Sequence, residues 1–439
     1  MAGPEGLGST EMTMRGRTAA SPSTGLGRIV LASLVGTTIE FYDFYIYGTA
    51  AALVIGQTFF PQSAPGAQAL NAFLTFGIAF LARPVGSVLF GHFGDRIGRK
   101  STLVASMLVM GLSTTFIGLL PGYATAGAVA PWLLCVLRFG QGIGLGGEWG
   151  GAALLATENA PTGRRAWFGM FPQLGPPLGF LLANGLFLLL LLGLGETSFV
   201  AWAWRVPFLV SAVLVAIGLY LRVSMTETPA FLDAMRRHER VKVPLAELLR
   251  HHGVPLIQGS LSIVVCYALF YISTVFALGY AVGTRHLARS DVLEMLCVAV
   301  VFMAIATPIS ARLADRFGRR PVLLAASALA GLSGFLMPAM LGRGDAGEVL
   351  AFLSIELGIM GLTFAPLGAL LPELFPTHVR YTGASSAYNL GGIVGASLAP
   401  FLAQLLLERG GLAWVGHYVT AAAAISFLAV LGMKETGRT

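Results

Sequence analysis

Long apolar segments dominate this sequence and restrict what it can fold into. Twelve stretches are long and apolar enough to cross a bilayer, which takes about 20 mostly apolar residues. Lipid offers backbone groups no hydrogen-bond partner, so each crossing segment must be helical. The predicted spans are residues 29–56, 70–92, 101–121, 129–156, 167–193, 202–222, 255–282, 292–313, 321–341, 349–373, 381–407 and 412–432. The sequence therefore predicts an all-α membrane protein with twelve transmembrane helices.

The composition supports a membrane protein and argues against a nucleic-acid-binding one. The chain is 55% hydrophobic and 11% charged, with a mean hydropathy of +0.76. A soluble protein this apolar could not cover its surface with polar groups. The net charge of +7 does not indicate nucleic acid, because the basic residues lie between spans. Cys135, Cys266 and Cys297 all lie in apolar runs, so we interpret them as core residues and predict no metal site.

Lysine and arginine orient the spans. If the N-terminus is cytoplasmic, 21 of the 28 basic residues lie on the inner side. The outer side then keeps Arg285, Arg289, Arg343 and Arg409. Cytoplasmic loops of membrane proteins carry an excess of basic residues. We therefore expect both termini to be cytoplasmic.

The longest predicted inner loop divides the chain into two sets of six spans. We expect residues 1–27 to be a disordered cytoplasmic N-terminus, because they are small and polar. They do not resemble a signal peptide, because the next apolar run is too long and too acidic. The remaining predicted parts are a six-helix bundle at 28–222, a cytoplasmic linker at 223–254, a second six-helix bundle at 255–433 and a cytoplasmic tail at 434–439.

Three motifs occur twice, in the same order, and indicate that the two halves are repeats. GHFGDRIGRK recurs as ARLADRFGRR, 220 positions later. ENAPTGRR recurs as ELFPTHVR, and QLGPPLG recurs as NLGGIVG. Each pair follows or lies in the corresponding span of its half. Such parallel repeats predict two pseudo-symmetric bundles related by an axis along the membrane normal.

The repeated motif G-x-x-x-D-R-x-G-R-K resembles that of the major facilitator superfamily, and the resemblance covers the whole chain. The further motifs IEFYDFYIYG, RFGQGIGLGGEWGGA and WAWRVPF resemble the metabolite–proton symporter branch, which includes carriers of α-ketoglutarate, shikimate, citrate and proline/betaine. The resemblance implies a bacterial cytoplasmic-membrane carrier that works by alternating access and is functional as a monomer. It implies a small-molecule substrate and no cofactor, with protons as the coupling ion.

The charged residues of the repeated loops are candidates for a cytoplasmic latch. Gly98 and Gly318 permit tight turns, and the basic residues can bond a helix C-terminus or Glu158 and Glu373. The resemblance implies that such a network stabilises the outward-facing state, although these residues could instead only fix topology. The candidates are Gly91, Asp95, Arg96, Gly98, Arg99, Lys100, Glu158, Arg165, Asp315, Arg316, Gly318, Arg319, Arg320, Glu373 and Arg380.

Two acids inside the first span are candidates for the proton site. Glu40 and Asp43 are three residues apart and share one helix face with Tyr47. A charge in the middle of a bilayer costs several kcal/mol, so these groups should face a cavity or a partner. Our hypothesis is that Glu40 or Asp43 takes up the proton.

Embedded basic and amide groups are candidates for the substrate site. Arg83 lies 12 residues before Asp95, hence roughly 18 Å inside the membrane, where it could pair with an acid of the first span. Arg138 and Gln141 are three residues apart, and Glu148 follows in the same glycine-rich segment. If a substrate carboxylate competes for Arg83 or Arg138, an acid is released to take a proton. The alternative is a permanent structural acid–arginine pair.

The second half offers polar but uncharged candidates. Tyr267 and Tyr271 are one helical turn apart in the seventh span, the repeat partner of the first. Gln173 and Asn389 occupy matching positions in spans five and eleven. These four side chains could contact substrate, or they could be ordinary helix-packing groups.

The predicted function is proton-coupled uptake of a small organic acid or zwitterion. An osmolyte carrier for proline or betaine is the alternative, although the chain ends at KETGRT without the long C-terminal coiled coil of that type. A drug–proton antiporter, which QLGPPLG partly resembles, and a transporter-like sensor are further alternatives. We predict no enzyme, because no nucleotide-binding loop, HExxH motif or Cys/His metal spacing is present. The sequence leaves open which substrate is carried and whether protons or sodium drive it.

Overall fold

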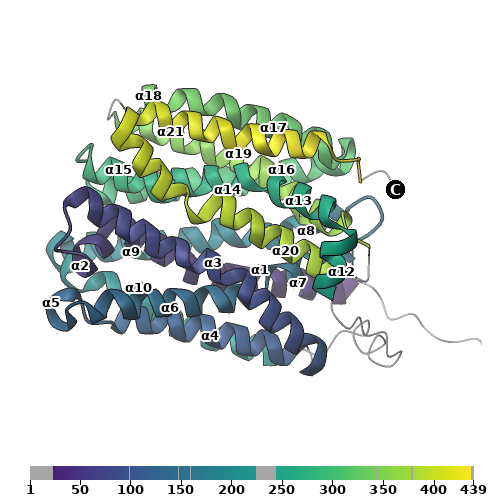
Figure 1. Cartoon of the computed structure of the whole chain (residues 1–439), viewed down its shortest axis with the longest axis horizontal. Helices are drawn as coiled ribbons and strands as arrows, with labels where there is room; N and C mark the ends of the chain where they lie inside the picture. Colours follow the sequence, from purple (N-terminus) through teal and green to yellow (C-terminus); the bar gives the residue numbers. More distant parts are fainter. Residues whose placement is uncertain are drawn as a thin grey trace, which may run out of the picture.

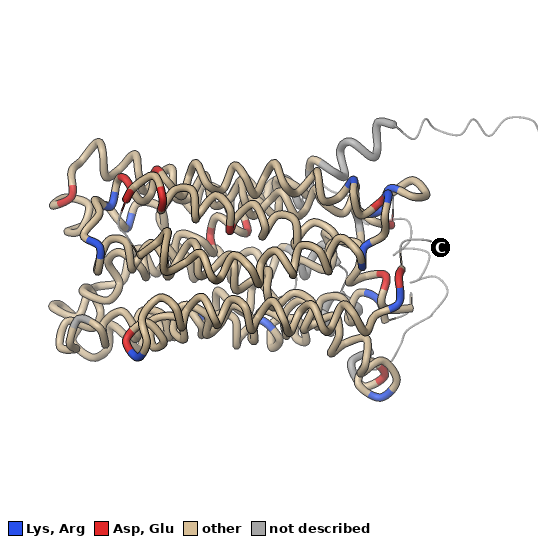
Figure 2. The backbone as a smooth tube through the Cα atoms, turned by 90° about the horizontal axis from the view of Figure 1, so that it is seen from above, with Lys and Arg blue, Asp and Glu red and all other residues tan. Residues whose placement is uncertain are grey.

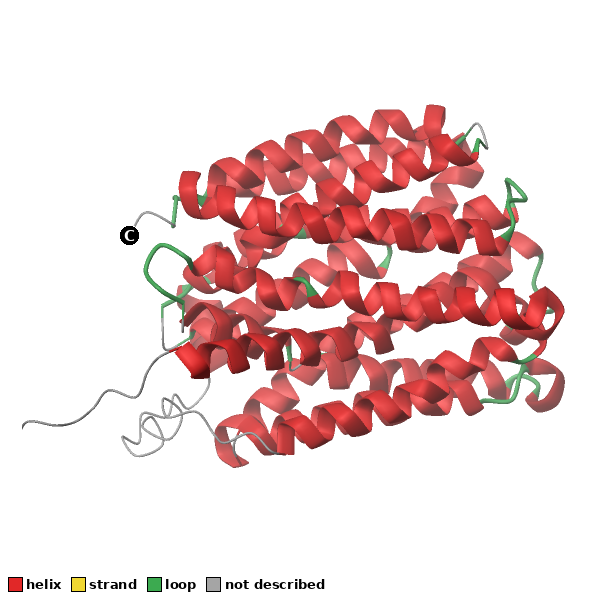
Figure 3. Cartoon of the chain, turned by 180° about the vertical axis from the view of Figure 1, so that it is seen from behind, coloured by secondary structure: helices red, strands yellow, loops and turns green. Residues whose placement is uncertain are grey.

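The computed structural model describes residues 23–97, 99–146, 148–158, 160–223, 244–342, 345–376 and 379–436. Throughout these ranges every regular element is helical (Figure 3). The long helices run alongside one another between two ends of the molecule (Figure 1). The arrangement is that of a helical bundle.

The first half consists of six crossing segments. Their helices are α1 (Ser23–Ala50) with η1 (Ala51–Ile55) and α2 (Gly56–Phe59); α3 (Pro65–Ile97); α4 (Arg99–Leu119); α6 (Val129–Leu145) with α7 (Trp149–Glu158); α8 (Arg165–Gln173) with α9 (Gly175–Ala201); and η2 (Ala203–Arg205) with α10 (Val206–Val223). The short α5 (Tyr123–Ala126) joins the third segment to the fourth.

The second half repeats this arrangement after α12 (Pro244–His251). Its segments are α13 (Gly253–Ser262) with α14 (Val264–Tyr271), η3 (Ile272–Phe276) and α15 (Ala277–Gly283); α16 (Arg289–Phe317); α17 (Arg319–Ser333) with η4 (Gly334–Leu336) and α18 (Met337–Met340); α19 (Ala346–Glu373); and α20 (Arg380–Gly392) with η5 (Ile393–Ser397), followed by α21 (Ala399–Leu431).

The helices agree with the twelve predicted spans. In the described ranges, nine helical segments are long and apolar enough to cross a membrane. The first predicted span is α1, and the apolar part of the third is Val104–Leu119. The last two predicted spans run together in Arg380–Leu431, where Gly411 has a φ of 72° that breaks the helix. Two details differ from expectation, because α1 begins at Ser23 and α12 forms within the predicted linker.

The two halves pack against each other along several helices. In Figure 1 the first half, purple to blue, lies mainly below the second half, green to yellow. Contacts between the halves join α9 to α16, α8 to α19, and α3 to α20 and η5. In an apolar 18-residue window of the seventh span, Gly253–Gly283, 94% of the residues are buried, against 33% in the corresponding window of Arg165–Ala201. The seventh span therefore lies at the centre of the bundle and carries Tyr267 and Tyr271 there.

A backbone irregularity repeats together with the motifs. The π-helical segments η1 and η3 begin 221 positions apart in the first and seventh spans, close to the 220-residue offset of the repeated loop motif. The two segments contact each other across the interface between the halves. π-Helical turns are rare and locally widen a helix. The pseudo-symmetry thus extends to the backbone geometry of two central spans.

Gly142 allows α6 to pack closely against α3. A Cβ atom added there would lie 2.1 Å from the carbonyl oxygen of Ala79, and a backbone atom in a helix cannot move aside. We expect Gly142→Val to destabilise the protein by about 1–3 kcal/mol or more through overpacking. Thermal melting of the purified protein in detergent measures this. Gly185→Val is the matched control, because no atom lies within 4 Å of that position; equal melting of the two variants would contradict the packing argument.

Candidate functional site

Asp43 of α1 is a fully buried carboxyl group. Its exposed fraction is 0%, and neither side-chain oxygen has a hydrogen-bond partner. The Ser211 hydroxyl lies close to it without meeting hydrogen-bond geometry, and Glu148 acts on it electrostatically. An isolated buried charge is very unfavourable. In this conformation the geometry favours the neutral, protonated carboxyl.

Two other acids lie near the same region. Glu40 and Glu148 are each 3% exposed, and both make polar interactions within the protein. Glu40 lies in the neighbourhood of Tyr388 of the second half. One Glu148 oxygen, Oε2, has no hydrogen-bond partner, whereas both oxygens of Asp43 lack one.

Arg83 of α3 is a buried arginine with an open edge. It is 2% exposed, and its guanidinium lies 4.2 Å from the ring centre of Phe80 and 4.5 Å from that of Phe44. Its Nε and Nη2 atoms have no hydrogen-bond partner. Both Asp43 oxygens also lack a hydrogen-bond partner, so Arg83 does not pair with Asp43 in this conformation, and its pairing with Glu40 stays a prediction. Nε and Nη2 form the edge that binds a carboxylate with two parallel bonds.

Arg138 of α6 is occupied by the protein itself. Its Nε donates to the Thr75 carbonyl at 3.3 Å, its Nη2 donates to the Phe76 carbonyl at 2.8 Å, and its Nη1 donates to Gln141 Oε1. The guanidinium also lies 3.8 Å from the ring centre of Tyr47. All three nitrogen positions therefore have partners on α3 and α6, and Arg138 stabilises the first half.

Gln141 and Tyr47 extend this internal network. The Gln141 amide donates to the backbone carbonyl of Asp43 at 2.7 Å and to Thr114 Oγ1 at 3.0 Å. The Tyr47 hydroxyl shares a 2.6 Å hydrogen bond with Thr75. These contacts join α1, α3, α4 and α6, and they hold the helix segment that carries Asp43.

The second half contributes an aromatic wall opposite Arg83. Tyr267 and Tyr271 are 5% and 1% exposed, and their ring centres lie 6.2 and 5.4 Å from that of Phe80. Arg83 lies in the neighbourhood of both tyrosines. The Tyr267 hydroxyl lies close to that of Tyr388 but makes no hydrogen bond of normal geometry. The structure thus brings unpartnered donors from both halves to the same region.

A stacked aromatic pair crosses the interface between the halves. Trp149 and Tyr388 lie with ring centres 3.9 Å apart and ring planes 8° apart. The Trp149 indole donates to Gln173 Oε1 at 3.1 Å, and Gln173 Nε2 donates to the Phe364 carbonyl at 3.1 Å. Trp149 and Tyr388 were not among the sequence candidates. Tyr388 directly precedes the repeated motif residue Asn389, which was the only signal for it.

Asn389 also joins the two halves. Its Nδ2 donates to Ser87 Oγ at 2.7 Å and to the Gly146 carbonyl at 3.3 Å. Nearby, Ser397 Oγ donates to the Gly77 carbonyl at 3.1 Å. The predicted amide pair, Gln173 and Asn389, therefore bonds across the interface between the halves in this conformation.

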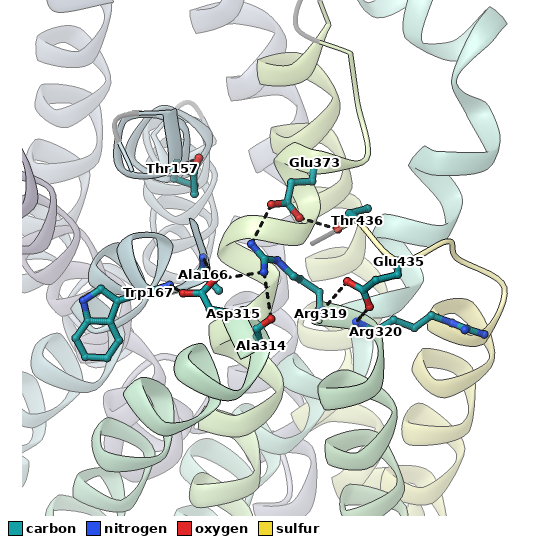
Figure 4. A network of polar contacts seen from close by, with 11 residues as sticks. Thr157, Ala166, Trp167, Ala314, Asp315, Arg319, Arg320, Glu373, Glu435 and Thr436 are labelled. Atoms are coloured by element: carbon teal, nitrogen blue, oxygen red, sulfur yellow. Dashed lines mark hydrogen bonds and ion pairs between the residues drawn. The ribbon is translucent and has the colours of Figure 1, made fainter. Parts of the chain in front are cut away.

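The cytoplasmic end is closed by Asp315 of α16. Its two carboxylate oxygens accept hydrogen bonds from the backbone N–H groups of Ala166 and Trp167 at 2.9 Å (Figure 4). Those groups lie at the N-terminus of α8 in the other half, where a negative charge is favourable. Arg319 holds Asp315 at 3.3 Å and Glu373 at 3.1 Å. The candidate latch of the second half thus contacts the first half directly.

A second polar contact at this end joins the halves. Arg380 lies 3.6 Å from Glu158, and both side chains are partly exposed. These two residues and Arg165 line a cavity of about 380 Å³ with Glu373. Arg316 is exposed and lies over Phe317, and Gly318 has a φ of 103°, which glycine adopts without strain.

The C-terminal segment adds two residues that the sequence did not indicate. Glu435 accepts hydrogen bonds from the backbone N–H groups of Arg319 and Arg320 at 2.9 and 3.0 Å. Thr436 donates to Glu373 at 2.6 Å. Figure 4 shows both beside the Arg319 network. Acidic side chains are generally favoured at helix N-termini, here that of α17. The sequence did not indicate this contact, because Glu435 lies more than 100 residues after Arg319.

The first-half copy of the repeated loop motif, GHFGDRIGRK, lies outside what the structure describes in side-chain detail. Gly98 is not among the described residues, and nothing is described of the side chains at Gly91, Asp95, Arg96, Arg99 and Lys100. Their proposed role remains a prediction.

The outer end is also closed in this conformation. Arg289 of α16 forms an ion pair with Glu196 of α9. A Cβ atom at Gly48 would lie 3.2 Å from Val275, so α1 and η3 pack closely there. A cavity of about 310 Å³ lies beside α3. Asp43, Arg83 and Tyr267 are 0%, 2% and 5% exposed, so these central groups are shielded from solvent in this conformation.

Charged residues gather at the two ends of the molecule. Figure 2 shows most described acidic and basic residues at the two ends, with a few of each near the middle. Helices of membrane-spanning length in two repeated halves, with buried polar groups between them, are the architecture of secondary transporters.

The comparisons give the family. Residues 29–254 match the Sugar (and other) transporter model, and residues 260–438 match the Major Facilitator Superfamily model. The chain is 52% identical to the inner membrane metabolite transport protein YhjE of Escherichia coli K12, over 95% of this chain and 96% of that protein. The chain belongs to the major facilitator superfamily.

Other relatives differ in what their names say they carry. The Escherichia coli K12 shikimate transporter is 38% identical, over 94% of this chain and 95% of its own. The Salmonella typhimurium proline/betaine transporter is 32% identical, over 94% and 84%. Among solved structures, a partially occluded inward-open form of the Escherichia coli xylose transporter XylE has a TM-score of 0.75 at 17% identity, covering 95% of this chain and all of that one. That structure supports the fold alone.

Proposed function

We propose that this protein is a proton-coupled carrier that takes up a small organic acid across the bacterial inner membrane. The observation that carries the proposal is the open Nε–Nη2 edge of Arg83, buried at the interface between the halves. Buried guanidinium donors that make no hydrogen bond are unfavourable, and a cargo carboxylate would accept from both open nitrogens. The inner-membrane location is supported by the name of the YhjE relative.

Proton and cargo transport are coupled because closure of the two halves removes both Asp43 and Arg83 from water. In the outward-open state, the cargo carboxylate binds Arg83 and a proton binds Asp43. Closing the halves removes both groups from water, which is tolerable only if Asp43 is neutral and Arg83 is paired. Cargo and proton therefore cross together. Opening to the cytoplasm hydrates Asp43 again, so that the proton and the cargo leave.

The test is uptake into proteoliposomes driven by an imposed pH gradient, with a panel of organic acids and betaines. We expect the wild-type protein to accumulate an organic acid. Arg83→Gln should weaken cargo binding by roughly 10–100-fold, because a charged bidentate contact contributes about 1.5–3 kcal/mol. Arg409→Gln is the matched control, since Arg409 is exposed. Accumulation that is unchanged in Arg83→Gln would contradict the proposal.

A further inference from the structure

This inference rests on the proposed function and names the class of cargo. We propose that the carrier is built for a monocarboxylate with an uncharged, largely ring-like or apolar body, bound jointly by Arg83 of the first half and Tyr267 of the second half. Neither a dicarboxylate nor a betaine fits the partners that the described residues offer.

The number of buried arginines with unbonded donors limits how many carboxylates the cargo can have. Within the described spans, Arg138 donates from all three nitrogen positions to the protein. Arg205 donates to the Gly118 and Leu120 carbonyls at the end of α4. Arg83 alone among these three has an unpartnered edge, formed by Nε and Nη2. One guanidinium edge pairs with one carboxylate.

The surroundings of Arg83 disfavour a second negative charge. Phe44 and Phe80 cover its guanidinium, and Tyr267 and Tyr271 face Phe80 from the second half. An additional carboxylate would meet these rings, which offer no cation. Burying an unpaired carboxylate costs several kcal/mol. Closure of the two halves around a bound dicarboxylate is therefore unfavourable.

The same surroundings disfavour a cargo cation. An ammonium group needs either a vacant aromatic face or an open carboxylate. The faces of Phe44 and Phe80 are already occupied by Arg83, and Tyr267 and Tyr271 pack against Phe80 and against each other. Glu40 and Glu148 already make interactions within the protein, and Glu148 keeps one oxygen, Oε2, without a hydrogen-bond partner. Asp43 is unpartnered, but the proposed mechanism needs it to carry the proton. A betaine therefore has a partner for its carboxylate and none for its ammonium group.

Tyr267 supplies the contact from the opposite half. Its ring end packs against α20, because a Cβ atom at Gly392 would lie 3.4 Å from Tyr267 Cζ and 3.3 Å from Phe80. Its buried hydroxyl has no hydrogen-bond partner in the protein. A hydroxyl in this position can donate to the cargo carboxylate or bond a cargo hydroxyl. Binding one cargo from both halves favours the closed state.

Thermal shift of the purified protein tests the cargo class without membrane permeation. Matched probes share a ring and differ in charge: benzoate and hydroxylated ring monocarboxylates, phthalate as the dicarboxylate, and N-methylnicotinate as the zwitterion. We expect a monocarboxylate to bind at least tenfold more tightly than the other two classes. Equal or tighter binding of phthalate or N-methylnicotinate, or no stabilisation by any monocarboxylate, would overturn the inference.

Variants separate this inference from the proposed function. Tyr267→Phe should keep the melting temperature of the empty protein, because the hydroxyl it removes has no partner, and should weaken monocarboxylate binding roughly 2–10-fold. Tyr280→Phe is the matched control and should bind like wild type, because Tyr280 lies further along the same span, in α15. A dicarboxylate or zwitterion whose binding is lost in Arg83→Gln would overturn the monocarboxylate class alone. Cargo binding that survives Arg83→Gln, in a variant that still melts cooperatively, would overturn the anion site of the proposed function.

Discussion

Replacing Asp43 with asparagine is expected to abolish accumulation of cargo against its gradient while preserving exchange of cargo across the membrane. Asparagine has the shape of the protonated acid and never carries a charge. The halves of Asp43→Asn should therefore close without a proton, and cargo should only equilibrate. Proteoliposomes measure both quantities: uptake driven by a pH gradient, and counterflow of labelled cargo with no gradient.

Two comparisons make the Asp43 result specific. Asp291→Asn is the matched control, because Asp291 is an exposed acid in the first turn of α16, and it should retain driven accumulation. Glu40→Gln distinguishes the two candidate acids, since Glu40 already interacts within the protein. If driven accumulation persists in Asp43→Asn and is lost in Glu40→Gln, the proton site is Glu40 and not Asp43.

Neutralising Asp315 is expected to open the cytoplasmic end. Its carboxylate accepts hydrogen bonds from two backbone N–H groups of α8 and forms an ion pair with the Arg319 guanidinium. Hydrogen bonds to a charged group contribute about 1.5–3 kcal/mol each, so Asp315→Asn should shift the closed-to-open ratio by roughly 10–100-fold. Glu158→Gln should shift it less, because its contact with Arg380 is partly exposed and longer, and such pairs contribute about 0–1 kcal/mol.

A cysteine at Ser385 reports this opening. Ser385 of α20 is 6% exposed and packs against Gly150 of α7, where an added Cβ would lie 1.9 Å from Ser385 Oγ. In a background without Cys135, Cys266 and Cys297, Ser385→Cys should react slowly with an impermeant maleimide in inside-out vesicles. Adding Asp315→Asn should raise the rate, whereas adding Asp291→Asn should not. Equal rates in all three would show that Asp315 does not hold the cytoplasmic end closed.

The sequence predicted the fold because the strongest signals were one-dimensional. Apolar length sets the spans, and the repeated loop motifs set the two halves. It also placed the central polar groups, since Asp43 and Arg83 lie in the middle of apolar segments and a charge there must be turned away from lipid. No three-dimensional information was needed for these conclusions.

The pairing of those groups could not be predicted. Arg83 and Arg138 look alike in the sequence, because each is a single arginine in a glycine-containing apolar span. Only the structure shows that the carbonyls of Thr75 and Phe76, on another helix, face Arg138. The Trp149–Tyr388 stack and the Glu435 contact likewise depend on how segments far apart in the chain meet.

The most direct test is an experimental structure of the protein with a transported cargo bound. The account predicts that the cargo carboxylate lies between the halves, with its two oxygens about 2.7–2.9 Å from Nε and Nη2 of Arg83. A cargo whose carboxylate binds elsewhere, while both of those nitrogens still have no acceptor, would contradict it.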